Sequence, residues 1–177
     1  MKFLFITFFA LISLAVGAQA LKISTTESTA AFKIKNLGIN VNGTIGGLQG
    51  NIIFNATNPA SNIFHATAAV STIYAVSNGC AEHLKSPDFF DVNKYPVIDI
   101  VGTKVTPKGN NTYLASAVCT MHGVSKKIEF EFTASPKGNG YLFTGSFSLN
   151  RRDYGVGGKT LTLSDDVDVK LSIVAYP

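Results

Sequence analysis

Few side chains in this sequence stand at spacings that could support catalysis. The 177 residues include three histidines, His65, His83 and His122, and two cysteines, Cys80 and Cys119. Cys80 and His83 are three residues apart, which would place a thiolate and an imidazole on one side of a helical turn, as a metal site could use. A metal site needs three or four ligands, however, and no C-x-x-C or H-E-x-x-H motif accompanies the pair. We therefore predict no metal and no other cofactor.

A nucleophilic site would need a serine or cysteine beside a histidine and a carboxylate. The sequence has no G-x-S-x-G motif, and nothing in the spacing selects His122 with either cysteine. Cys119 shares the alternation of the apolar residues around it, which is typical of a buried side chain. We predict no catalytic residues and no enzymatic activity, with an exported enzyme using His83 and His122 as the alternative. A disulfide between Cys80 and Cys119 is left open, because sequence does not show how far apart they lie.

The remaining chemistry lies in the paired arginines Arg151 and Arg152, which follow an apolar run. A guanidinium suits both carboxylate and phosphate, so Arg151 could close a salt bridge at one end of the fold or hold an anionic head group. Basic runs are no longer than two residues, and the formal net charge is only +4. Nucleic acid is therefore not a predicted partner.

The first twenty residues have the pattern of a secretory signal peptide. Lys2 precedes the apolar run Phe3–Val16, and Ala18-Gln19-Ala20 forms a cleavage site. The run is too short to span a bilayer, and no later stretch approaches the roughly 18 to 20 apolar residues that a transmembrane helix requires. We expect a single domain from Leu21 to Pro177 that is periplasmic or secreted, without stable membrane insertion.

The elements that must position any site are strands, because apolar residues alternate at a period of two from Leu21 onward. Pro-Lys-Gly-Asn occurs at 107–110 and again at 136–139, each time between two alternating segments, and predicts hairpin turns with a glycine of positive φ. Eight antiparallel strands could form an up-and-down barrel or a two-sheet sandwich. We favour an all-β, lipocalin-like barrel because closure removes exposed edges. The eight segments are Ala30–Lys35, Gly50–Phe54, Asn62–Ile73, Val97–Val105, Thr112–Met121, Ile128–Ala134, Tyr141–Leu149 and Val167–Tyr176.

A helical insert interrupts the alternation from Ser77 to Pro96. Asn78 can cap a short helix through Lys85, and Ser86-Pro87-Asp88 has the cap, first-turn proline and first-turn acid of a second one. We expect the insert to cover one end of the barrel, as an entrance or lid.

Two adjacent aromatic rings, Phe89 and Phe90, lie in this insert. Both cannot face solvent without exposing a large apolar area, so at least one should point into the barrel mouth and touch a ligand. We expect His83 and Asp91 to hold the insert against the rim by hydrogen bonds. In the alternative, both rings plug the barrel permanently.

An eight-stranded barrel can enclose one small elongated ligand. Small side chains on the dry face would leave space that bulky residues would fill, whereas in the alternative they match large neighbours across a filled core. The predicted lining residues are Phe32, Ile34, Phe54, Phe64, Ala66, Ala115, Ala117, Phe143 and Phe147.

Several segments resemble the YceI-like family of exported bacterial proteins. Phe32–Gly38 is similar to the family's opening F-x-I-K-H/N-L-G, and Glu82–Pro96 to its E-H-L-x-S-x-D-F-F-D-V-x-K-Y-P almost throughout. His122–Lys126 and Arg151–Val156 resemble its H-G-V-T-K and R-x-D-F/Y-G-V segments. The sequence departs from the family at Cys80-Ala81, where members usually carry Arg-Asp.

The resemblance implies a non-enzymatic, lipocalin-like barrel that binds a long-chain isoprenoid or other lipid, without metal or nucleotide. The ligand classes are a polyisoprenoid, an isoprenoid quinone or a fatty-acid-like chain, held for transport, storage or sequestration. A homodimer is left open. The predicted ligand contacts are the lining residues given above together with His83, Phe89, Phe90 and Arg151.

Overall fold

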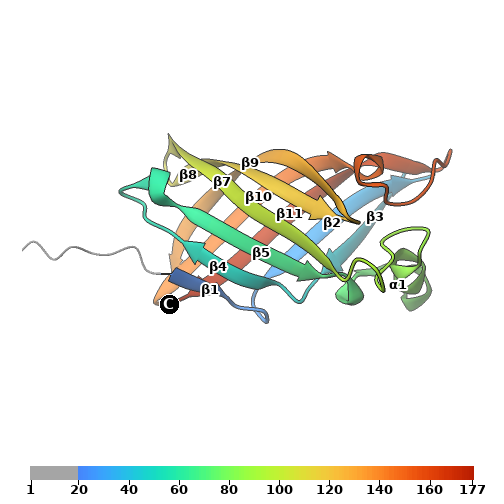
Figure 1. Ribbon diagram of the computed structural model, residues 1–177, viewed down its shortest axis with the longest axis horizontal. Helices are drawn as coiled ribbons and strands as arrows, with labels where there is room; N and C mark the ends of the chain where they lie inside the picture. Colours follow the sequence, from blue (N-terminus) through green and yellow to red (C-terminus); the bar gives the residue numbers. More distant parts are fainter. Residues whose placement is uncertain (1–19) are drawn as a thin grey trace, which may run out of the picture.

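The computed structural model describes residues 20–177 (Figure 1). The signal peptide predicted for residues 1–20 therefore lies, apart from Ala20, outside the described residues. None of the helices in residues 20–177 is long and apolar enough to cross a bilayer.

The described chain is all-β with one short α-helix. The α-helix is α1 (Asn78–Lys85), and three single-turn 3-10 helices are η1 (Pro59–Ser61), η2 (Val70–Thr72) and η3 (Arg151–Tyr154). The strands are β1 (Ala20–Ile23), β2 (Thr29–Asn36), β3 (Ile39–Ile45), β4 (Gln49–Ile53), β5 (Ile63–Ala69), β6 (Tyr74–Ala75), β7 (Val97–Gly109), β8 (Thr112–Met121), β9 (Val124–Lys137), β10 (Gly140–Asn150) and β11 (Leu163–Tyr176).

The strands close into a barrel of eight antiparallel staves. The ring runs β1-β4-β5-β7-β8-β9-β10-β11 and closes where β1 pairs with β11. β2, β3 and β6 add no further positions to the ring, because each continues another strand. β1 and β2 both pair with β11; β4 pairs with β1 while β3 pairs with β2; and β5 pairs with β4 while β6 pairs with β3. The predicted eight-stranded barrel is confirmed, and the two-sheet sandwich is excluded.

Three of the eight positions in the barrel are each formed by two shorter strands, where the sequence predicted a single strand. β3 was not among the predicted strands, although Ile39, Val41 and Ile45 alternate with polar residues. Gly43 breaks that pattern for a steric reason: a Cβ at this position would overlap the ring of Phe32, which occupies the inner face beside it. The missing side chain thus makes room for a neighbouring aromatic ring.

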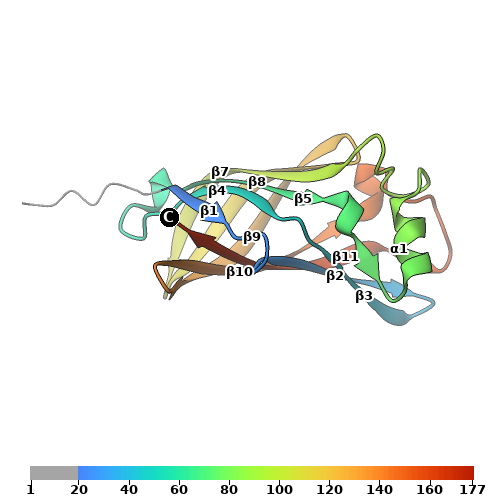
Figure 2. The same ribbon diagram turned by 90° about the horizontal axis from the view of Figure 1, so that it is seen from below.

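Both predicted hairpins are present at the end of the barrel far from α1 (Figures 1 and 2). Gly109 and Gly138 have positive φ values of 92° and 59°, as expected. The first turn is completed one residue later than predicted, by Asn110 and Asn111, which also have positive φ.

The insert between β6 and β7 contains one helix, not two. α1 spans the predicted residues, but its cap is Ser77, whose Oγ accepts a hydrogen bond from the amide of Cys80 at 3.3 Å. The second predicted helix is wrong, because residues 86–95 form hydrogen-bonded turns. The amide of Phe90 donates to the carbonyl of Leu84 at 3.0 Å, and Asp91 has a φ of +46°, which no right-handed helix allows.

Candidate ligand-binding site

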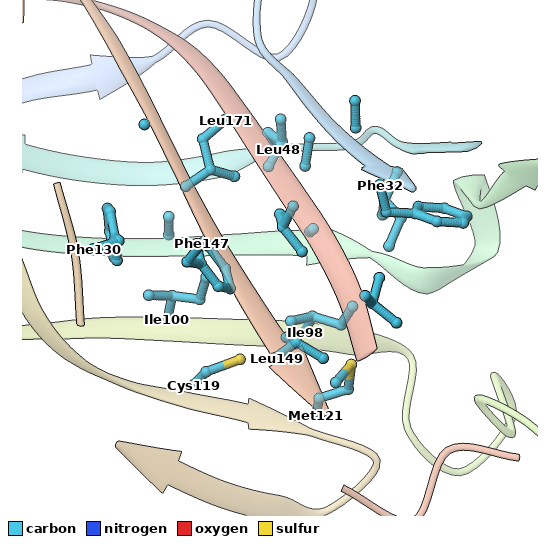
Figure 3. A pocket seen from close by; sticks show the side chains of 18 of the residues that line it. Phe32, Leu48, Ile98, Ile100, Cys119, Met121, Phe130, Phe147, Leu149 and Leu171 are labelled. Atoms are coloured by element: carbon cyan, nitrogen blue, oxygen red, sulfur yellow. The ribbon is translucent and has the colours of Figure 1, made fainter. Parts of the chain in front are cut away.

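A cavity of about 660 Å³ runs through the barrel interior (Figure 3). Its wall is almost wholly apolar, and its volume lies within the roughly 300 to 1,000 Å³ typical of small-molecule sites. The side chains labelled in Figure 3 come from β2, β7, β8, β9, β10 and β11 and from the loop before β4: Phe32, Leu48, Ile98, Ile100, Cys119, Met121, Phe130, Phe147, Leu149 and Leu171.

A cluster of aromatic rings closes the cavity at the end far from α1. The ring of Phe54 packs edge-on against Tyr113, Tyr141 and Phe143, with centroid distances of 5.5, 4.9 and 5.2 Å. Tyr113 stacks in turn on Phe132 at 5.3 Å. These rings, which we call the aromatic floor, fill the barrel at this end, so the space for a ligand lies between the floor and α1.

Most of the predicted lining residues lie on the cavity wall, because the period-two alternation places them on the inner face. Their contact with a ligand stays a prediction. Those on the wall are Phe32, Ile34, Phe54, Phe64, Ala66, Phe143 and Phe147.

Ala115 and Ala117 face inward but do not line the cavity. They are 0% and 2% exposed and pack in one cluster with Phe130, and the rings of Phe64 and Phe147 cover the same cluster. Small side chains here match large neighbours, as the filled-core alternative supposed, and the space is left elsewhere along the wall.

The insert supplies the cavity wall at the α1 end. His83, Phe89 and Phe90 all line the cavity, and the rings of His83 and Phe89 meet at a centroid distance of 4.8 Å. A Cβ on Gly157 would lie 2.8 Å from Cε1 of Phe89, so this ring is wedged between α1 and the loop that precedes β11. The insert therefore covers part of the cavity opening, mainly by ring packing.

The expected hydrogen bonds from the side chains of His83 and Asp91 to the rim are absent within residues 20–177, which corrects that prediction. Backbone bonds within the turns hold this segment instead: the amides of Lys94 and Tyr95 donate to the carbonyl of Asp91 at 2.9 and 2.8 Å. The ring of Tyr95 also packs against His122 at a centroid distance of 4.6 Å.

Arg151 is 3% exposed and lies on the cavity wall, but its donors are already used. Nε donates to the carbonyl of Ser164 at 2.9 Å, and the two terminal nitrogens donate to three further carbonyls and to the carboxylate of Asp165. Burial lowers the pKa of Arg151, while Asp165 opposes that effect. Of the two roles left open, the structure supports the salt bridge at one end of the fold, because Arg151 pairs with Asp165 at 3.0 Å. Its other hydrogen bonds hold the loop beside the cavity mouth.

Among residues 20–177, no hydrogen bond joins a cysteine to a histidine. Cys80 and Cys119 both line the cavity as free thiols, and burial raises the pKa of Cys119 to about 11, which makes it a poor nucleophile. His122 lies off the cavity wall, where its Nδ1 donates to the carbonyl of Tyr154 at 3.2 Å. In the described part of the chain no three His, Cys, Asp or Glu side chains converge on a possible metal position.

Sequence reasoning missed several wall residues that the same alternation could have found. Ile98 and Ile100 share one face of β7, and Leu149 follows Phe147 on the inner face of β10. The alternation was present in these strands, but the prediction named no lining residue in β7 and only the aromatic ones in β10.

The fold and cavity together define a closed antiparallel β-barrel with an apolar interior and a short helical insert over one end. The YceI-like domain family matches residues 21–175. The chain therefore belongs to the YceI-like family, as the sequence resemblance predicted.

Individual relatives agree with this membership. UPF0312 proteins of Pseudomonas savastanoi pv. phaseolicola and Pseudomonas syringae pv. syringae are each 31% identical to this chain over 148 residues, covering 80% of it and 77% of the relative.

Solved structures share the fold at lower sequence identity. BcnA of Burkholderia cenocepacia superposes with a TM-score of 0.82 at 20% identity, covering 86% of this chain and 98% of BcnA. A polyisoprenoid binding domain from Saccharophagus degradans, implicated in plant cell wall breakdown, superposes with a TM-score of 0.69 at 13% identity, covering 88% and 97%.

Proposed function

We propose that this protein is a non-enzymatic carrier that holds one long apolar lipid chain inside the barrel, with the polar end of the lipid toward α1. The observation that carries the proposal is the apolar cavity of about 660 Å³ between the aromatic floor and the insert. Burying apolar ligand surface contributes about 25 cal/mol per Å², so such a wall favours a hydrocarbon chain without many polar contacts. The binding domain from Saccharophagus degradans supports an isoprenoid as the ligand class.

The cavity volume sets an approximate chain length. At about 30 Å³ per non-hydrogen atom, the volume of a liquid water molecule, 660 Å³ accommodates roughly 22 atoms. A prenyl chain of about four isoprene units fits this space, and a longer chain would extend through the mouth.

The orientation follows from where the polar groups lie. Asn36, Thr160 and Thr162 line the wall at the mouth. The floor end is lined by aromatic rings and by Asn62, whose Oδ1 accepts a hydrogen bond from the amide of Asn55 at 2.6 Å and whose Nδ2 has no partner within residues 20–177. A head group placed among these side chains can be hydrated or hydrogen-bonded, but a head group at the floor would be desolvated at a cost.

Transport or sequestration in the periplasm or outside the cell is part of this proposal, supported by the signal-like residues 1–20. Amino-terminal sequencing of the protein from an exported fraction should find Leu21 first. A chain that still begins with Met1 in that fraction would contradict export by cleavage.

A substitution that fills the cavity tests the binding proposal. Ala66→Phe adds a phenyl ring of roughly 180 Å³ at about 30 Å³ per atom, which removes about a quarter of the space. Val101→Phe adds the same ring on the outer face of β7 and serves as the matched control. We expect delipidated wild-type protein and the control to bind geranylgeraniol in a fluorescence competition assay, and Ala66→Phe to bind it at least about tenfold more weakly. Equal binding by all three proteins would refute the cavity as the site.

A further inference from the structure

Four exposed apolar side chains surround the mouth of the cavity. Leu37 and Ile39 lie at the β2–β3 hairpin, Val76 lies between β6 and α1, and Leu161 lies in the loop before β11. We call these four side chains the apolar rim. Their exposed fractions are 74%, 70%, 68% and 102%, and they make up half of the eight strongly exposed large apolar residues in the described chain. Apolar surface residues that occur singly need no explanation, but a cluster at one opening does.

The apolar rim continues the wall of the cavity outward. Ile34 and Val41 are paired across β2 and β3 and line the cavity, and the next pair on the same face is Asn36 with Ile39. Ile39 therefore extends the inner surface beyond the mouth.

The other rim segments adjoin this hairpin. The amide of Leu37 donates to the carbonyl of Thr162 at 2.8 Å, which brings the hairpin tip beside the loop that carries Leu161. β6, which leads to Val76, pairs with β3. Figures 1 and 2 show the hairpin, the loop and α1 together at one end of the barrel.

The segments that carry the apolar rim contain only positive charges, although Glu82, Asp153 and Asp165 lie next to them in the sequence. These three segments, residues 35–46, 72–81 and 154–164, contain Lys35 and Lys159 and no aspartate or glutamate. Both lysines are exposed, and neither pairs with a carboxylate among residues 20–177. Apolar side chains flanked by lysines complement the surface of a bilayer that contains anionic lipids.

We propose that the apolar rim docks the barrel, mouth first, on the surface of an anionic lipid bilayer. The four side chains enter the region between head groups and acyl chains, while Lys35 and Lys159 contact lipid phosphates. Docking places the open end of the apolar cavity against the apolar layer, so that a lipid passes between the two without crossing water. The contact is peripheral and reversible. The docking itself does not depend on the proposed carrier function, but the transfer of a lipid during docking rests on it.

Vesicle flotation of the purified mature chain tests the docking. We expect the wild type to float with vesicles of phosphatidylglycerol and phosphatidylcholine, and much less with phosphatidylcholine alone. The double variant Leu37→Gln/Leu161→Gln should partition about tenfold more weakly, because both side chains are exposed and their loss affects only the bilayer contact. Val101→Gln, an exposed apolar position on the outer wall of β7, is the matched control and should float like the wild type.

Charge and fold are checked on the same vesicles. Lys35→Gln/Lys159→Gln should weaken flotation with anionic vesicles and reduce its dependence on salt. Unchanged melting temperatures of both double variants establish that they fold. A wild type that does not float, or a Leu37→Gln/Leu161→Gln variant that floats like the wild type, overturns the proposal.

Two further measurements keep this proposal separate from carrier function. Rim variants should bind geranylgeraniol in solution like the wild type but take it up more slowly from vesicles. Protein that floats yet binds no prenol in solution supports docking while refuting the carrier proposal. A wild-type dimer in sedimentation that the rim variants dissociate, together with no flotation, identifies a second copy of the chain as the occupant and overturns docking.

Discussion

Replacing Phe89 by alanine distinguishes a movable lid from a fixed plug at the mouth of the barrel. The Phe89 ring is partly buried, meets the ring of His83, and lies against Gly157 in the loop before β11. It therefore connects the insert to the opposite side of the opening. If the insert moves to admit a lipid, this contact must break and re-form.

The structure sets the size of each effect. Truncating a fully buried phenylalanine costs about 3 to 5 kcal/mol, and the partial burial of Phe89 reduces this to roughly 2 kcal/mol of unfolding free energy. If a bound lipid covers about 50 Å² of the Phe89 ring, the loss of this contact at about 25 cal/mol per Å² weakens lipid retention by roughly 1.3 kcal/mol, or about tenfold. A lid account thus predicts faster release with a moderate loss of stability.

The assay compares Phe89→Ala with Phe143→Ala. Release of bound geranylgeraniol to acceptor vesicles is followed by fluorescence, and stability by chemical denaturation. Phe143 belongs to the aromatic floor and is 7% exposed, so its truncation should cost about 3 to 5 kcal/mol of stability without opening the mouth. If Phe89→Ala is as destabilised as Phe143→Ala yet releases lipid at the wild-type rate, the ring is a plug and the lid account fails.

Three further predictions follow from the loop and the buried thiol. Gly157→Ala should cost about 1 to 3 kcal/mol in chemical denaturation, because its φ is +67° and the new Cβ would crowd both Arg151 and a ring of the insert, whereas Gly158→Ala, with no atom within 4 Å, should be nearly neutral. Arg151→Gln should lower the free energy of unfolding by about 3 kcal/mol or more, because it leaves carbonyls that the guanidinium binds without donors. At the exposed neighbouring position, Arg152→Gln should change it by less than about 0.5 kcal/mol. A small effect at Arg151 would show that its guanidinium is free for a ligand. Burial raises the pKa of Cys119 from near 9 to about 11, so above pH 9 the unfolded chain releases a proton that the folded chain keeps. The free energy of unfolding should therefore fall as the pH rises from about 9 to about 11. Cys119→Ala should make this decline smaller, and an equal decline in the variant would contradict the assignment to Cys119.

The strand pattern was predictable from sequence because burial of one face fixes a period of two. Phe143 and Phe147 were placed correctly on the cavity wall by that rule alone. The rule predicts which face of a strand a side chain occupies. It does not predict whether that side chain reaches the cavity, because this depends on neighbouring side chains from other strands. Ala115 and Ala117 therefore point inward as predicted, yet larger side chains seal them from the cavity.

Contacts that depend on the path of a loop were not predictable. The carbonyls that accept hydrogen bonds from Arg151 come from residues 156–164, and the sequence does not show that this loop turns back to the guanidinium. The insert shows the same limit: the signals for a second helix at Ser86-Pro87-Asp88 were present, but backbone bonds to the end of α1 produced turns instead. Local propensity is a weak guide where such contacts compete with it.

Mass spectrometry of the protein purified from its native source tests the central claim most directly. Native spectra should show one bound molecule per chain, and organic extracts should identify it as a lipid with a hydrocarbon chain of about 20 carbons or more, in keeping with the cavity of about 660 Å³. Ala66→Phe expressed in the same host should carry much less of it, and Val101→Phe the same amount as the wild type. A wild-type protein that carries no lipid, and takes up none when offered geranylgeraniol, would contradict the claim that the barrel is a lipid carrier.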